Sequence, residues 1–167
     1  MRRLSILTIV SVSMCLAVSA DTTPDAPAAA PETFTLWQLP NQTHVQMMSY
    51  VIQTPDGSLL VIDGGNAGDA DYLREFILAR GGQVNAWIIT HVHSDHVDAI
   101  IEILKEPGTI TVGAFYGSIP EREWVATHAG QSELDTWDAL SGALAQSGHQ
   151  VAELAIGQRL TLDTVNI

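Results

Sequence analysis

Apolar residues recur along the chain with two kinds of spacing, and together they predict an α/β fold. Short apolar or alternating runs bounded by turn residues are typical of strands, and apolar residues three or four positions apart are typical of helices. The predicted strands are 34–39, 45–53, 58–63, 86–90, 109–116, 151–156 and 159–162; the predicted helices are 69–80, a segment carrying Val97 to Leu104, 120–128 and 132–147. Strands and helices alternate in the middle of the chain, as in a layered α/β fold.

Turn and cap residues separate these elements. Thr54-Pro55-Asp56-Gly57 predicts a tight turn, so the strands on either side of it should form a hairpin. Asp69 is expected to cap the helix 69–80, and Gly81-Gly82 to end it. Three further boundaries are predicted: Pro107-Gly108 after the second helix, Pro120 at the first position of the third, and Gly157 at the turn of a hairpin formed by the last two strands.

The first twenty residues differ in kind from the rest. A basic start precedes the apolar stretch Leu4–Val18, and Val18-Ser19-Ala20 resembles a cleavage site before Asp21. This pattern predicts a secretory signal peptide over residues 1–20, and hence an exported protein that is periplasmic or extracellular. The apolar stretch is short for a spanning helix, so an uncleaved anchor is the weaker alternative, and lipidation at Cys15 is weaker still.

The remaining chain divides into a leader and one domain. Residues 21–33 contain several Pro and Ala and predict a flexible leader. Residues 34–167 are expected to form a single domain. Because the chain still reads as a strand at its end, this domain is expected to be incomplete at its C-terminus.

Composition and charge narrow the range of partners. The chain is 46% hydrophobic and 16% charged, as globular proteins are, and its net charge is −12. Removing the signal peptide with its two arginines leaves five basic against nineteen acidic residues, a net charge of −14. Such a charge disfavours a nucleic-acid surface or an anionic membrane as partner. Cys15 is the only cysteine and leaves with the signal, so no disulfide or thiolate ligand is expected.

Four potential metal ligands follow the predicted strand 86–90, within the stretch His91-Val92-His93-Ser94-Asp95-His96. Imidazole suits zinc and neighbouring metals, and a carboxylate adds a harder oxygen ligand. Positions i and i+2 of an extended segment point to the same side, so His91 and His93 should lie together. Asp95 and His96 then need a turn to reach a second point. The spacing therefore indicates two adjacent metal positions fed by one loop; the alternative is a solvated loop with incidental histidines.

This stretch matches the HxHxDH signature and resembles the metallo-β-lactamase fold superfamily. The resemblance extends upstream, where Tyr50 to Gly65 is similar to an opening hairpin that ends in Asp-Gly-Gly, and Ile89-Thr90 is typical before the first His. It covers roughly residues 34–116. It implies that the chain is the N-terminal half of a four-layer αβ/βα sandwich with a two-metal site at the sheet edge.

The resemblance also implies a role for each site residue. His91 and His93 would bind the first metal, and Asp95 and His96 the second. Asp63 would lie beneath the loop and orient ligands by hydrogen bonds, unless it simply caps the turn that follows it. A further His, a bridging Asp and a second His are expected downstream. Two zinc ions per complete domain are implied, with manganese or iron as alternatives.

The implied chemistry is metal-assisted hydrolysis. Paired dications make hydroxide available near neutral pH, and Asp95 could orient this nucleophile or carry a proton as a catalytic residue. Ser94 stands where the di-iron oxidoreductase branch usually has Glu, which favours the zinc hydrolases. Such hydrolysis could act on an ester, thioester, amide or phosphodiester. The pattern looks most like the subgroup related to the extracytoplasmic domain of competence proteins, which leans towards phosphodiesters. An ester or phosphodiester bond is therefore expected, in a small molecule or a phosphodiester substrate. The alternatives are a truncated, catalytically incomplete metal-binding fragment and a binding module.

The other candidate residues are expected to be structural. The remaining histidines are predicted to be surface or capping residues, and only the late position of the third makes it worth testing as a ligand: His44, His128 and His149. Four further large side chains are predicted to be core residues: Met47, Met48, Trp124 and Trp137.

Overall fold

The computed structural model describes residues 33–162 and 165–166, so the predicted signal peptide over 1–20 and nearly all of the predicted leader lie outside the described residues. A six-stranded sheet organises the fold, in the order β1-β2-β3-β5-β7-β8. Its strands are β1 (Thr35–Gln38), β2 (Ser49–Gln53), β3 (Leu59–Asp63), β5 (Ala86–Ile89), β7 (Phe115–Gly117) and β8 (Val151–Glu153). The first three are antiparallel, and β3, β5, β7 and β8 run parallel.

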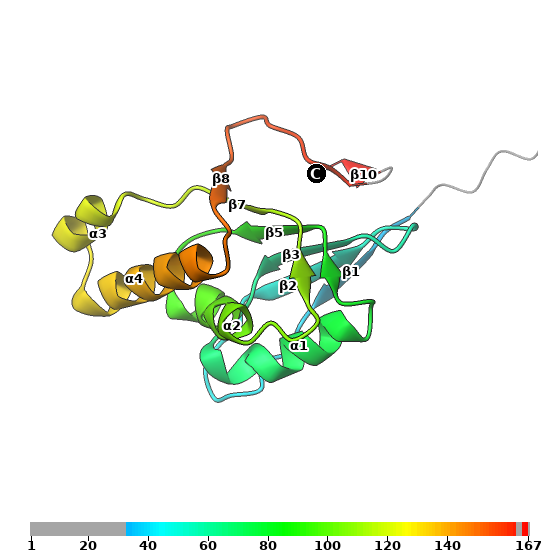
Figure 1. The fold of residues 1–167 in the computed structure, drawn as a ribbon, viewed down its shortest axis with the longest axis horizontal. Helices are drawn as coiled ribbons and strands as arrows, with labels where there is room; N and C mark the ends of the chain where they lie inside the picture. Colours follow the sequence, from blue (N-terminus) through cyan, green and yellow to red (C-terminus); the bar gives the residue numbers. More distant parts are fainter. Residues whose placement is uncertain (1–32, 163–164, 167) are drawn as a thin grey trace, which may run out of the picture. The chain divides into compact units, whose positions relative to one another are not determined.

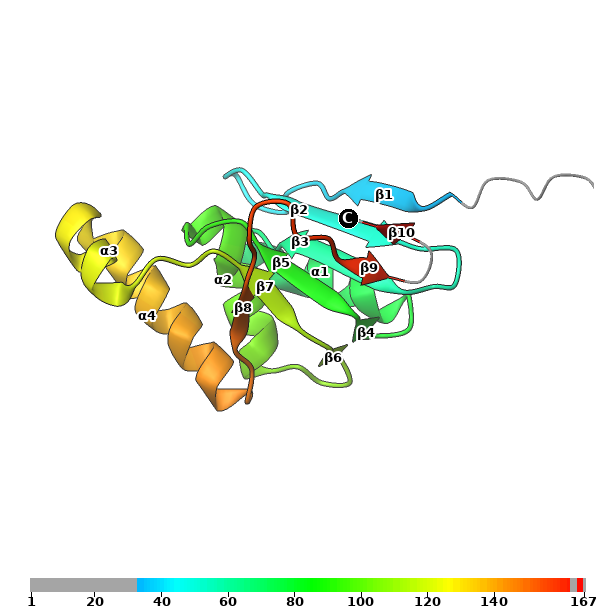
Figure 2. The same cartoon turned by 90° about the horizontal axis from the view of Figure 1, so that it is seen from above.

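The helices lie on one face of this sheet (Figures 1 and 2). They are a 3-10 turn (Ala67–Asp69), α1 (Ala70–Leu78), α2 (Ser94–Lys105), α3 (Arg122–His128) and α4 (Gln131–Gln146). Two pairs of short strands complete the described chain: β4 (Gln83–Val84) with β6 (Thr111–Val112), and β9 (Thr161–Leu162) with β10 (Val165–Asn166). One sheet with one helical layer confirms the expected α/β class, and the two correspond to two of the four layers that the resemblance implies. Within the described part of the chain, none of the helices has the length and apolar character needed to span a membrane.

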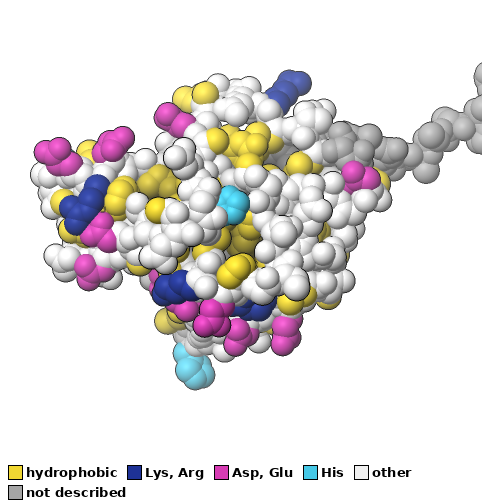
Figure 3. Space-filling view, in the orientation of Figure 1, with side chains coloured by type: hydrophobic (Ala, Val, Ile, Leu, Met, Phe, Trp, Pro, Cys, Tyr) yellow, Lys and Arg dark blue, Asp and Glu magenta, His cyan; other side chains and the backbone are white. Residues whose placement is uncertain are grey.

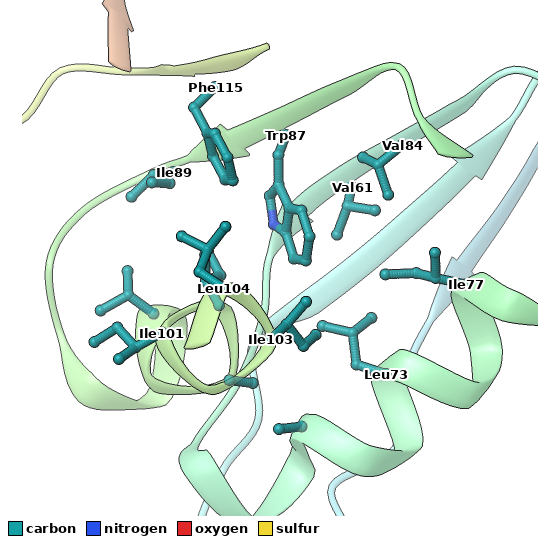
Figure 4. Close-up of a cluster of buried hydrophobic side chains, with 14 of the residues drawn as sticks. Val61, Leu73, Ile77, Val84, Trp87, Ile89, Ile101, Ile103, Leu104 and Phe115 are labelled. Atoms are coloured by element: carbon teal, nitrogen blue, oxygen red, sulfur yellow. The ribbon is translucent and has the colours of Figure 1, made fainter. Parts of the chain in front are cut away.

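A row of inward side chains crosses four strands and forms the centre of the core. Val51, Val61, Trp87 and Phe115 are register partners on adjacent strands, and all four are fully buried. The Trp87 and Phe115 rings stack with their centroids 5.7 Å apart. Helices α1 and α2 pack against this row with apolar side chains such as Ile103 (Figure 4). Burying each such side chain stabilises the fold by about 1.5–3 kcal/mol.

The predicted strand 109–116 is wrong as a single element. It divides into β6 and β7, which belong to different sheets. Gly113 lies between them, and a Cβ there would come within 2.6 Å of the Asn85 carbonyl oxygen. The sequence keeps alternating across residue 113, so the pattern does not reveal the break. At the break the Gly113 backbone passes close to the Asn85 backbone, which a residue without a side chain allows.

The predicted C-terminal hairpin around Gly157 is also wrong. Strand β8 pairs in parallel with β7, and β9 pairs with β10 instead. The alternation of 151–156 predicts a strand but does not identify the strand that pairs with it. In the structure β8 pairs with the free edge of β7. Three strands are also shorter than expected by at least two residues at one end: β2 begins at Ser49, β8 ends at Glu153 and β9 begins at Thr161.

Three smaller predictions are corrected by side-chain and helix positions. Asp69 does not cap α1 with its side chain; it accepts hydrogen bonds from the backbone N–H of Asn66 at 3.0 Å and of Gln42 at 2.7 Å. It therefore ties the loop before β2 to the 3-10 turn. Helix α3 begins at Arg122, two residues after Pro120. Trp124 is 54% exposed and stacks on His128, so it is not a core residue.

Candidate metal centre

Two neighbouring parallel strands bring the candidate residues to one edge of the sheet. Ile62 of β3 pairs with Ile88 of β5, so the residues that follow each strand emerge side by side. Asp63 ends β3, and Thr90 follows β5. This is the carboxyl edge of the parallel strands, where open α/β sheets commonly bind ligands.

His91 and His93 face each other, as their spacing on an extended segment predicts. His91 Nε2 lies 3.1 Å from His93 Nδ1. His91 is half-buried and His93 is exposed. Two nitrogens bound to one tetrahedral zinc ion at about 2.0–2.1 Å would be about 3.3 Å apart. The pair therefore fits two positions of a zinc ion or a similar transition metal.

Asp95 and His96 lie in the first turn of α2, which begins at Ser94, so the second half of the motif is helical and not the loop expected from the sequence. The backbone N–H groups of His96 and Val97 donate to the His93 carbonyl oxygen and start the helix. His96 is buried, and its Nε2 lies 3.7 Å from an Asp95 carboxylate oxygen. Its ring centroid is 3.8 Å from that of His91, so the helix turn brings the two halves of the motif together.

Asp63 lies beneath the motif and is bonded to it. The side chain is 2% exposed, and one carboxylate oxygen lies 2.7 Å from His96 Nδ1. The other oxygen accepts the backbone N–H of Thr90 at 2.9 Å. The Trp87 indole donates to the Asp63 carbonyl oxygen at 3.0 Å, so the core also holds this residue in place. A carboxylate bonded to Nδ1 leaves Nε2 of His96 as the nitrogen that could bind a metal.

The charge state of His91 suits the same chemistry. Burial lowers the pKa of His91 below its ordinary value, and the neighbouring rings of His96 and His93 lower it further. Metals bind the neutral imidazole, so this ring can accept a metal without first losing a proton at neutral pH.

The side chains at this edge supply only part of the ligands that a complete metal site needs. Among residues 33–162 and 165–166, no group of three or more His, Cys, Asp or Glu side chains is placed to hold a metal ion. The downstream His, Asp and His that the resemblance implies have no counterpart beside the motif in this part of the chain. The residues present thus fit a metal through the His91–His93 pair, with His96 and Asp95 adjacent.

The other histidines lie apart from the motif. His44 and His128 are exposed, and the His128 Nδ1 is bonded to the Trp124 carbonyl oxygen within α3. His149 packs on the Phe115 ring, with the centroids 5.3 Å apart. It precedes β8, whose first residue pairs with the first residue of β7, so it lies at the opposite edge of the parallel strands. His149 is therefore not brought to the motif.

Sequence reasoning missed the part of the site that comes from α4. A polar cavity of about 220 Å³ lies between the first turns of α2 and α4. It is lined by His93, Ser94, Asp95, Ser132, Glu133 and Thr136. No sequence signal connects α4 to the motif, because the approach of the two helices depends on tertiary packing. A larger cavity of about 540 Å³, lined in part by Trp137 and His149, lies between α4 and β8 and does not include the motif.

Comparisons with known proteins agree with these observations. Residues 43–114 match the model of the metallo-beta-lactamase superfamily. The UPF0173 metal-dependent hydrolase of Thermodesulfovibrio yellowstonii is 32% identical over 84 residues, covering 46% of this chain and 32% of the relative. The resemblance stated from the sequence is therefore confirmed over this segment. The chain spans about a third of the length of this curated relative.

Three solved structures are similar at low sequence identity. The metallo-beta-lactamase fold protein YhfI from Bacillus subtilis is 18% identical with a TM-score of 0.44, covering 73% of this chain and 44% of that one. The metallo-beta-lactamase SMB-1 is 17% identical with a TM-score of 0.47, covering 72% and 45%. A diphosphatase from the PhnP family is 18% identical with a TM-score of 0.42, covering 71% and 40%. None of these scores reaches 0.5, so the family match rests on the sequence of residues 43–114.

Proposed function

Because residues 43–114 match the metallo-beta-lactamase superfamily, we propose that this chain provides the histidine-rich metal site of a metal-dependent hydrolase. The observation that carries the proposal is the His91–His93 nitrogen pair, 3.1 Å apart, beside a His96 ring held by Asp63. Nitrogen donors with one adjacent carboxylate suit zinc, and manganese or iron are the alternatives. Two ions per complete site are proposed, with Asp95 and His96 serving the second.

The proposed reaction is hydrolysis of an ester or phosphodiester bond. When bound, the metal ions would lower the pKa of a coordinated water and polarise the substrate oxygen. Asp95 is partly exposed beside His96, where its carboxylate can orient the attacking water or hold its proton. The hydroxyls of Ser132 and Thr136 line the adjacent cavity and can hydrogen-bond a polar substrate group. The choice of bond rests on the resemblance to the competence-protein subgroup.

Metal content and hydrolysis test this proposal together. We expect the wild-type chain to bind zinc, measured by atomic absorption after gel filtration, and to hydrolyse a phosphodiester reporter such as bis(p-nitrophenyl) phosphate. The double variant H91A/H93A should lose bound zinc and at least about 100-fold of the activity, because it removes both facing donors. The matched control H44A/H128A removes two exposed histidines and should behave as wild type. Equal zinc binding by the two double variants would refute the site.

A second candidate function is metal binding without hydrolysis. It is favoured because no three His, Cys, Asp or Glu side chains among the described residues are placed to hold one metal ion together. The two candidates differ in stoichiometry: a catalytic site should hold close to two ions per chain, and an incomplete one should hold one ion or fewer and lose it on dialysis. A binding module that uses the fold only as a scaffold would bind its ligand equally well in the presence of a chelator.

We also propose export and a small-molecule or phosphodiester substrate. Export rests on the N-terminal sequence pattern, and N-terminal sequencing of the protein recovered outside the cytoplasm should begin at Asp21. The net charge of −12 disfavours nucleic acid as a partner. On the face drawn in Figure 3, Lys and Arg do not gather into a continuous patch.

A further inference from the structure

The Thr90 hydroxyl lies among three polar groups of the motif. Its oxygen is 2.7 Å from an Asp63 carboxylate oxygen, 3.1 Å from His91 Nδ1 and 3.2 Å from His96 Nδ1. The backbone N–H of Thr90 donates to the other Asp63 oxygen at 2.9 Å. The side chain and main chain of Thr90 are therefore both held by one buried carboxylate.

The protons in this cluster can be assigned by counting donors and acceptors. The Asp63 carboxylate only accepts, so the Thr90 hydroxyl donates to it, and so does His96 Nδ1 at 2.7 Å. A hydroxyl has one proton, and that proton is used on Asp63. The Thr90 oxygen must then accept from His91, which requires a proton on His91 Nδ1.

We infer that Thr90 is a positioning residue that fixes His91 in the Nδ1–H tautomer and leaves its Nε2 lone pair free for a metal. In water, a neutral histidine favours the opposite tautomer, Nε2–H. In that form His91 would donate to His93 Nδ1, 3.1 Å away, and the lone pair would be lost to the metal. One hydroxyl thus carries the orienting effect of Asp63 to a second ring, that of His91, through the two contacts of the Thr90 oxygen.

The tautomers can be measured without a metal. Long-range ¹H–¹⁵N correlation spectra of the full, metal-free chain at neutral pH distinguish the two forms of each ring. We expect Nδ1–H for both His91 and His96 in the wild type. T90V replaces the hydroxyl by a methyl of similar size and should move His91 to Nε2–H, while T90S keeps the hydroxyl and the wild-type tautomer. His96 is an internal control, because its bond to Asp63 does not need Thr90.

Zinc affinity provides the second measurement. Competition with a chelating dye should show binding to T90V weakened by about 10-fold or more, and binding to T90S close to wild type. Only this zinc measurement rests on the proposed function; the tautomer measurement does not. Absence of zinc binding by the wild type would overturn the proposed function and leave the tautomer assignment standing. An Nε2–H form of His91 in the wild type, or an unchanged His91 in T90V, would overturn the inference whatever the metal does.

Discussion

Asp63 is the one non-glycine residue with a positive φ, 55°, within residues 33–162 and 165–166. Aspartate tolerates this conformation better than most residues, and strained backbone is concentrated at functional sites. The main chain bends there into Gly64-Gly65, while the carboxylate stays bonded to Thr90 and His96. The bend and the ring that it supports therefore form one structural unit.

The ion pair between Arg122 of α3 and Asp138 of α4 gives a prediction for a single residue. Arg122 donates to both Asp138 oxygens, at 2.6 and 2.7 Å, and these bonds lower the pKa of the Asp138 carboxyl. A lowered pKa means that the contribution to stability is present above the ordinary value of 3.8 and is lost as the pH falls through the folded-state value. We expect R122Q to lower the melting temperature slightly at pH 7 in low salt.

Salt and pH distinguish this ion pair from simple packing. Both side chains are exposed, so the difference between R122Q and wild type should vanish near 1 M salt, where the screening length is about 3 Å. It should also shrink as the pH is lowered below about 3.8. A difference that persists unchanged at high salt, measured by circular dichroism, would show that Arg122 acts through its packed methylene groups instead.

At the residue scale, the sequence predicts what depends on local spacing. The facing of His91 and His93 follows from their i and i+2 positions after a strand. The family resemblance implies only that Asp63 orients some ligand of the motif. That this ligand is His96 cannot be read from the sequence, since 33 positions separate the two residues. The place of Thr90 between the two rings could not be predicted, because it requires β3 and β5 to be neighbours in one particular register.

Helix α2 shows how one element joins the motif to the core. Its first turn accepts backbone hydrogen bonds from Met48 to Asp95 at 3.1 Å and from Gly64 to His96 at 2.6 Å. Further along, the Ala99 N–H donates to the Gly65 carbonyl oxygen at 3.0 Å. The turn after β3 therefore holds the helix that carries half of the candidate ligands.

Gly64 lies where the turn after β3 packs against α2. An added Cβ would lie 2.8 Å from Ile100 Cγ1 and 3.2 Å from the Ile100 backbone nitrogen. We expect G64A to push α2 away and to destabilise the fold by about 1–3 kcal/mol in chemical denaturation. The control is G142A in α4, where nothing lies within 4 Å of the new Cβ and a gain of up to about 1 kcal/mol is expected. Unchanged stability of G64A would show that the contact is not tight in solution.

Elements with strong local patterns were predicted well, and elements that depend on partner choice were not. The β2–β3 hairpin, α1, α2 and α4 match expectation within a few residues, because a turn or an apolar stripe specifies each of them. Helix α2 begins at Ser94, inside the metal-ligand motif, where the spacing of the histidines predicts a loop. Strands β6 to β10 have two or three residues each, which is too short a pattern to specify a partner. Of these, only β7 and β8 join the six-stranded sheet, and β6, β9 and β10 belong to two separate pairs.

At the scale of the whole molecule, the two faces of the sheet differ. The helical layer covers the row from Val51 to Phe115. The opposite face carries a second row in the same register, Tyr50, Ile62, Ile88 and Tyr116, and all four side chains are only partly buried. The helices lie on the first face alone (Figure 1). In the four-layer sandwich that the resemblance implies, an apolar face with this exposure would be covered by a second sheet.

Ile88 and Ile89 are adjacent in β5 and point to opposite faces of the sheet. The same substitution at each position therefore compares how much each face contributes to stability. Ile89 is 1% exposed on the helical side, and Ile88 belongs to the partly buried row. I89T should destabilise the fold by about 2–4 kcal/mol, because it leaves a cavity and buries a hydroxyl. I88T should cost less than about 1 kcal/mol and should reduce the fluorescence of a bound hydrophobic dye. If I88T is as destabilising as I89T, the second row is already part of a closed core, and the sheet needs no further layer to cover it.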